Sequence, residues 1–186
     1  MKLKNLEKLI RKTGYMEVIE GGDELWLGNG YAAAPLYDFR RLSDEQLKAL
    51  FNFTEKDEGK IVISRIGADE LLVNDVKDEE LLGPALLGLT LGEREYEVYE
   101  SRQGTVFLPT ELLKPFLAED GSARLFVRRR EHGVTVAVKK GFFLCGLIEA
   151  SQHVITRSLC ETLETLYVDT AKQLDETPPG ALLAQL

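Results

Sequence analysis

The chain has little of the side-chain chemistry on which most enzymes depend. Its 186 residues include only two histidines and two cysteines. His132 falls in a predicted turn and His153 near a predicted helix start, and neither has a serine, cysteine or carboxylate at a catalytic spacing. Cys145 and Cys160 stand far apart in apolar or helical surroundings, which is typical of reduced packing residues. We therefore expect a protein that is not an enzyme, with no metal site and no cofactor.

Long apolar runs are also missing. No stretch reaches about 18 continuous apolar residues, and the first lysines are not followed by the apolar segment of a signal peptide. These absences predict a cytoplasmic protein with no membrane partner. Hydrophobic residues still make up 44% of the chain, which is enough to build a folded core.

Charge is unevenly distributed along the chain. The net charge is -8, which disfavours indiscriminate coating of nucleic acid. Residues 1–14 nevertheless carry five basic groups and one acidic group, so that the remaining residues carry a net charge of -12. The basic N-terminal segment is the most informative feature of the charge pattern.

Residues 3–13 have the spacing of an amphipathic helix that Gly14 would end. The apolar stripe consists of Leu3, Leu6, Leu9 and Ile10. The basic residues gather on the opposite side: Lys4, Lys8, Arg11 and Lys12. This basic face has two interpretations, because it suits a polyanion but is also common on ordinary solvated surface helices.

Three β-strands are predicted to follow, over residues 15–20, 24–27 and 31–36. The first two are joined by a glycine-rich turn at 21–23. The segment Gly28-Asn29-Gly30 joins the next pair, and it lacks both the spacing and the following helix of a phosphate-binding loop. We interpret it as a hairpin turn, and we expect Trp26 to belong to the core.

A second helix is predicted over residues 42–53. Ser43 can cap it with Gln46 as the reciprocal partner, and Leu42 can pack on Leu47. Residues 60–66 then alternate as a strand, with 70–73 as a candidate hairpin partner. Residues 76–94 mix acidic residues, glycine, proline and leucine, and we expect them to form a linker with a short apolar segment.

The clearest local signals lie in residues 107–148, which follow a further predicted strand. Residues 95–100 alternate as a half-exposed strand, and a short helix opens at Pro109 and Thr110, with Pro115 limiting its length. Three strands follow, separated by turns at 131–133 and 139–141. The last of them, 142–148, is apolar throughout, which predicts burial on both sides. The run Arg128-Arg129-Arg130 either binds an anion or places alternating charges at a sheet edge.

Together these patterns predict an α+β fold in which helices pack on one face of antiparallel sheets. Segments 42–65 and 108–129 share the order cap, short helix, acidic glycine turn and strand. They represent either an internal duplication or two examples of a common unit. We divide the chain into an N-terminal α/β half (1–75), a linker (76–94), a second α/β half (95–150), and a C-terminal helix and tail (151–186).

The segments NLEKLIRKTG, LWLGNGYAAAPL and 105–150 together resemble a repeat domain of the bacterial DNA polymerase sliding clamp, the β clamp. Short clamp-like proteins of phages and mobile elements have similar N-terminal segments. The resemblance covers about 110 residues and is one of pattern. The chain departs from the family at Asn29-Gly30-Tyr31-Ala32, where clamps typically place an aspartate and an arginine around the turn glycine.

The resemblance implies a non-catalytic protein that contacts duplex DNA through its phosphates, without reading the sequence. Clamps line their central hole with helices that carry Lys and Arg. The corresponding DNA-binding candidates here are Lys4, Lys8, Arg11 and Lys12 on the first helix, with Lys48 and Lys114 on the other two. Ring closure would require a homo-oligomer, with three copies if each chain supplies two repeats. The resemblance also implies a polymerase or other replication protein as a partner. The alternative is a protein-interaction or self-association module of a phage or mobile element with no DNA role.

Overall fold

The computed structural model describes residues 3–20, 24–67, 76–117, 122–130 and 133–150, together with positions 161–162, 165–166, 168 and 172. The first half contains α1 (Leu3–Thr13), β1 (Tyr15–Glu20), β2 (Leu25–Gly28), β3 (Ala32–Leu36), α2 (Asp44–Leu50), α3 (Glu55–Glu58) and β4 (Val62–Gly67). The second contains β5 (Glu80–Leu81), β6 (Gly83–Leu91), β7 (Arg94–Ser101), β8 (Gly104–Pro109), α4 (Thr110–Leu113), β9 (Ala123–Arg130), β10 (Gly133–Lys140) and β11 (Phe143–Glu149). The predicted α+β class is confirmed.

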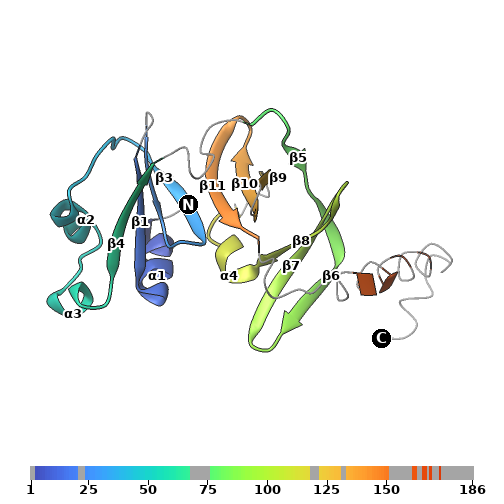
Figure 1. Ribbon diagram of the computed structural model, residues 1–186, viewed down its shortest axis with the longest axis horizontal. Coiled ribbons are helices and arrows are strands. Elements are labelled where there is room, and N and C mark those ends of the chain that lie inside the picture. Colours follow the sequence, from blue (N-terminus) through green and yellow to red (C-terminus); the bar gives the residue numbers. More distant parts are fainter. Residues whose placement is uncertain are drawn as a thin grey trace.

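The strands form two sheets. The large sheet has eight strands in the order β4-β1-β2-β3-β11-β10-β9-β5, and the small sheet has three in the order β6-β7-β8. All pairs are antiparallel except β1 and β4, which run parallel. Figure 1 shows the large sheet running through the middle of the molecule and the small sheet leaving it beside α4.

Two similar units build the centre of the large sheet. Each consists of a helix followed by three strands that pair in sequence: α1-β1-β2-β3 and α4-β9-β10-β11. The units meet edge to edge where β3 pairs antiparallel with β11, with Ala33 opposite Leu147. The predicted halves therefore share one continuous sheet.

Of the two interpretations of segments 42–65 and 108–129, the structure favours two examples of a common local unit. Strand β4 pairs in parallel with β1 at the edge of the sheet, whereas β9 is antiparallel to both β10 and β5. The two segments share a local order of elements but occupy different positions in the sheet. The candidate hairpin partner at 70–73 lies outside the described residues.

One face of the large sheet is covered by the helices. Leu6 and Ile10 of α1 and Leu47 of α2 pack on Met16 and Leu27. Leu9 of α1 joins the neighbouring cluster, in which α4 covers β9, β10 and β11. Along the face, α1 lies between α2 and α3 on one side and α4 on the other (Figure 1). A smaller apolar cluster, with Trp26 at 5% exposure, occupies the opposite face, as the alternation along β2 requires.

Local signals in the sequence agree with these elements. Ser43 Oγ accepts from the Gln46 N–H at 3.3 Å, and the Ser43 N–H donates to Gln46 Oε1 at 2.8 Å, which is the predicted capping box. Leu42 packs in the same cluster as Leu47. The strands predicted at 15–20, 31–36 and 95–100 and the short helix at Thr110 are also confirmed.

Two expectations were wrong. The segment expected to be a linker contributes β5 to the large sheet and β6 to the small one. Its glycines, leucines and single proline concealed the strand period. The strand at 142–148 is not covered along its whole length, since Phe142 is 98% exposed and Phe143 is 73% exposed. The predicted C-terminal helix falls mostly outside the described residues, although positions 161–162, 165–166, 168 and 172 are helical.

Candidate nucleic-acid interface

Helix α1 is fixed to the sheet by its apolar stripe and by its C-terminal end. Leu6, Leu9 and Ile10 are buried. The helix ends at Gly14, which has φ +67° and whose N–H donates to the Ile10 carbonyl at 2.9 Å. With this face packed, the opposite side of α1 has to face outward.

Lys4 and Lys8 lie on that outward side, one helical turn apart, and both are exposed. Within the described parts of the chain, neither lysine forms an ion pair. Their ammonium groups are therefore available to a ligand.

Arg11 lies on the same helix but is held by the protein. Its guanidinium donates to Glu7 Oε1 at 2.8 Å and to Asp57 Oδ1 of α3 at 2.6 Å. It also lies 5.0 Å from the centroid of the Phe53 ring. Arg11 therefore joins α1 to α3.

The charges around Arg11 shift its pKa and that of its partner. The hydrogen bond to Glu7, followed by that to Asp57, raises the pKa of Arg11 above its usual value. The pKa of Asp57 is lowered to about 2, mainly because its carboxylate accepts from the Thr54 N–H, and secondly because of Arg11. Both groups are charged at neutral pH, so this contact persists there.

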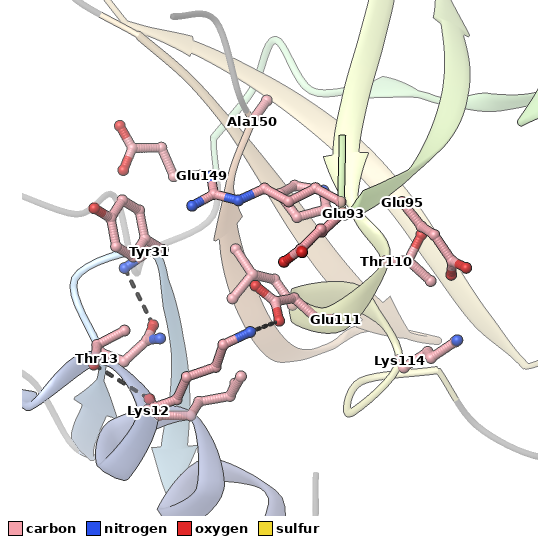
Figure 2. A pocket seen from close by; sticks show the side chains of 15 residues that line it. Lys12, Thr13, Tyr31, Glu93, Glu95, Thr110, Glu111, Lys114, Glu149 and Ala150 are labelled. Atoms are coloured by element: carbon pink, nitrogen blue, oxygen red, sulfur yellow. Dashed lines mark hydrogen bonds and ion pairs between the residues drawn. The ribbon is translucent and has the colours of Figure 1, made fainter. Parts of the chain in front are cut away.

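Lys12 points to the other side of α1 and pairs with Glu111 of α4 (Figure 2). Lys114 follows Glu111 by three residues, at the end of α4, and is exposed. Two neighbouring helices on this face of the sheet thus carry four of the predicted lysines: α1 carries Lys4, Lys8 and Lys12, and α4 ends at Lys114. Lys48 lies in the last turn of α2, on the other side of α1, and is half-buried.

A cleft of about 800 Å³ opens between α1, α4 and the turn that joins β6 to β7. Figure 2 shows Lys12, Glu93, Glu95, Glu111 and Glu149 around it. Its lining contains three basic and four acidic side chains, with apolar contacts from both helices. This balance of charge does not suit a polyanion, and the cleft is distinct from the ridge formed by Lys4 and Lys8.

Asn29 lines the cleft and is 1% exposed. Its Oδ1 accepts from the N–H groups of Tyr31 at 3.2 Å and Ala32 at 2.9 Å, which forms the predicted hairpin turn. Its amide Nδ2 is buried and has no hydrogen-bond partner. A buried donor without a partner is uncommon and marks a position where an acceptor would bind favourably.

No local pattern in the sequence indicated the cleft, because its lining comes from five separate segments of the chain. The sequence did indicate that the Arg128-Arg129-Arg130 run alternates: Arg128 is buried, whereas Arg129 is exposed and donates to Ser101 Oγ at 2.8 Å. Strand β9 pairs with β5 at Phe126 and Val127, whereas the run from Arg128 to Arg130 pairs with β10.

The described residues contain no group of three or more His, Cys, Asp or Glu side chains placed to hold a metal ion. His132 and His153, the two candidates for acid–base chemistry, lie outside the described residues. None of the helices in the described ranges combines the length and the apolar character that a membrane crossing requires.

Comparison with known proteins yields no relative. The chain matches no protein-family model, no curated protein and no solved structure.

Proposed function

We propose that this chain is a non-catalytic, sliding-clamp-like protein that contacts duplex DNA through the phosphates, without reading the sequence. The observation that carries the proposal is the exposed lysine ridge of α1, Lys4 and Lys8, on the helix-covered face of a two-unit sheet. Lys114 on α4 extends this basic surface toward the second unit.

The arrangement of the helices supports this proposal. Both α1 and α4 begin a helix-plus-three-strand unit, and both lie on the same face of the sheet. The sliding-clamp resemblance implies this kind of layer, in which helices from successive units line one surface. A duplex laid across that surface would meet the helices and not the strands.

The different contacts of the basic residues also support the proposed DNA contact. Arg11 and Lys12 pair with carboxylates of α3 and α4 and so hold the helices side by side. Lys4 and Lys8 form no such pairs within the described residues and remain free for phosphates. Two to three contacts per chain predict weak, salt-dependent binding by a single copy.

The test is fluorescence anisotropy with a labelled duplex of about 30 base pairs, titrated over a series of salt concentrations. The Lys4→Glu, Lys8→Glu double variant should lose binding at low salt. In the wild type, a plot of log affinity against log salt concentration should fall with a slope of about -0.9 for each phosphate contact. Duplexes of unrelated sequence should bind equally well.

The matched control is Lys77→Glu with Arg102→Glu, which changes the net charge equally at exposed positions in turns away from α1. This control should bind nearly as the wild type does. Equal loss in both variants would mean that net charge alone governs binding, and unchanged binding in the α1 variant would remove the DNA role.

Encircling a duplex also requires more than one copy, and we propose a homo-oligomer with a replication protein as a further partner. The second candidate function is a self-association module without DNA contact. The observation that favours it is the exposure of Phe142 and Phe143 at the turn between β10 and β11.

A further inference from the structure

Arg11 and Lys12 are neighbours on α1 and both form ion pairs, but the protein holds them to different degrees. Arg11 contacts two carboxylates, a backbone carbonyl at 3.3 Å and an aromatic ring. Within the described residues, Lys12 has one ion-pair partner, the carboxylate of Glu111. Arg11 is therefore built into the fold, whereas Lys12 depends on a single contact.

The pair formed by Lys12 and Glu111 is open to solvent. The two side chains are 64% and 48% exposed. Exposed pairs of this kind contribute little to stability, because water screens the attraction and two flexible side chains lose freedom when they pair. The apolar packing of Leu9 with Leu112 and Leu113 keeps α1 and α4 together when the pair opens. The Lys12 ammonium can therefore change its partner at little cost to the fold.

Lys12 continues the lysine ridge of α1. Lys4, Lys8 and Lys12 follow one another at intervals of four residues within a helix that is continuous from Leu3 to Thr13. Residues four apart are neighbours on a helix surface. The Lys12 ammonium is carried on a flexible four-carbon side chain. A polyanion that contacts Lys8 therefore passes within reach of Lys12.

Glu111 places a negative charge where this ridge meets α4. Lys114, three residues further along the chain, is exposed. Lys12, Glu111 and Lys114 all line the cleft between the two helices, and Figure 2 shows Lys12 reaching across to Glu111. The Glu111 carboxylate thus interrupts the series of cations that leads from α1 to α4.

We propose that Glu111 competes with DNA phosphates for Lys12, so that Lys12 is a further phosphate contact that Glu111 masks in the free protein. Lys12 can act in this way only where α1 contacts duplex DNA, so this inference rests on the proposed function. On the duplex, a phosphate replaces the carboxylate. The chain then exchanges a weak exposed pair for a contact that releases a counterion. Glu111 thereby lowers the affinity of the basic surface without contacting the DNA.

The experiment repeats the anisotropy titration with the same labelled duplex. Glu111→Gln should raise the affinity about two- to fivefold at low salt, because the duplex no longer has to displace a carboxylate. Lys12→Gln should lower the affinity and make the slope of the salt plot less steep by about 0.9. Asp78→Asn, the matched control, makes the same change of charge at an exposed turn outside both helices and should bind as the wild type does.

The double variant Lys12→Gln, Glu111→Gln tests whether Glu111 acts through Lys12. It should bind as Lys12→Gln alone does, because the carboxylate then has no ammonium to mask. An equal gain from Glu111→Gln in the presence and in the absence of Lys12 would show that Glu111 merely repels the duplex, and would overturn the proposal. Urea unfolding followed by circular dichroism verifies that each variant remains folded.

NMR of the Glu111 carboxyl carbon measures the exchange directly, with Glu111→Gln identifying the signal. In the wild type saturated with duplex, this signal should move toward its position in free Lys12→Gln, where the carboxylate lacks its partner. A signal that keeps its position on DNA would mean that the pair stays closed, which also contradicts the proposal.

Two further results separate this inference from the DNA contact itself. Duplex binding that depends on Lys4 and Lys8 but is equal in the wild type, Lys12→Gln and Glu111→Gln would remove the role of Lys12 and Glu111 alone. A wild type that binds no duplex at low salt would remove the DNA contact, and the competition for Lys12 with it.

Discussion

Glu79 lies against Arg128 on the face of the large sheet opposite the helices, where the Arg128 Nε donates to Glu79 Oε1 at 2.5 Å. The other carboxylate oxygen is 2.5 Å from the Lys139 ammonium. The side chains of Glu79, Arg128 and Lys139 are 9%, 0% and 12% exposed. One carboxylate therefore pairs with two cations that the neighbouring strands β9 and β10 bring together.

Because of these two contacts, Glu79 should contribute to the stability of the fold. Glu79→Gln should lower the free energy of unfolding by roughly 3 kcal/mol, because glutamine removes the negative charge that faces two largely buried cations. Urea unfolding followed by circular dichroism measures the change. Asp78→Asn, at the exposed neighbouring position, is the matched control and should change stability by less than about 0.5 kcal/mol. Equal effects at both positions would contradict the role of the buried pair.

Asp57 should contribute a pH dependence in the acid range. Its pKa is lowered from 3.8 to about 2, first by the hydrogen bond from the Thr54 N–H and then by Arg11. Since the folded pKa lies below the unfolded one, the contribution is complete above pH of about 4 and is lost as pH falls to about 2. As pH falls from about 4 to about 2, the difference in unfolding free energy between the wild type and Asp57→Asn should therefore become smaller.

The Arg11→Gln variant separates the two causes. It should raise the pKa of Asp57 but leave it below 3.8, because the Thr54 hydrogen bond remains. Titration of the Asp57 carboxyl carbon by NMR measures this directly. A pKa that returns fully to its usual value would assign the whole shift to Arg11.

The ring of Phe116 packs directly on the backbone of Gly146. A Cβ at position 146 would lie 2.0 Å from Phe116 Cε1, so the ring rests directly on the backbone of β11. Gly146→Ala should reduce stability by about 1–3 kcal/mol, because Phe116 is 4% exposed and has no free space into which to move. Gly133→Ala is the control, since nothing lies within 4 Å of its Cβ position.

The double variant Gly146→Ala, Phe116→Leu tests the cause. If the clash with the ring is responsible, the smaller side chain should recover part of the loss, and the two substitutions should be less destabilising together than their separate effects predict. Additive losses would place the effect of Gly146→Ala elsewhere, for instance in the backbone of β11.

The sequence predicted those elements that short-range rules determine. The capping box at Ser43 and Gln46, the Asn29 turn and the leucine stripe of α1 depend on residues within one or two turns of each other. Strand alternation likewise placed Arg128 and Arg129 on opposite faces, and Trp26 was correctly expected in the core. These features could be recognised because each is decided by local geometry.

The remaining features depend on pairings between distant segments. The parallel pairing of β1 with β4 and the junction of β3 with β11 leave no mark in the local pattern. The cleft joins side chains from position 9 to position 150, and Glu79 meets Arg128 across 49 residues. Residues 142–148 were expected to be buried because they are apolar, yet Phe142 and Phe143 extend past the edge of the core into solvent.

Gly14 determines where α1 ends and how the lysine ridge is oriented. It has φ +67°, and a Cβ there would lie 2.8 Å from the Lys60 carbonyl oxygen, a backbone atom that cannot swing away. The Gly14 carbonyl also accepts from the Val62 N–H at 3.0 Å, at the start of β4. Gly14→Ala should therefore destabilise the fold by more than about 1 kcal/mol, because the strained φ adds to the clash.

Gly59→Ala is the matched control for Gly14→Ala, since Gly59 has φ -80° and nothing lies within 4 Å of its Cβ position. Alanine should be neutral there or stabilise by up to about 1 kcal/mol, because it restricts the unfolded chain without straining the folded one. Urea unfolding of both variants provides the comparison. A similar loss at the two glycines would mean that the end of α1 tolerates a side chain, and that the leucine stripe alone orients Lys4 and Lys8.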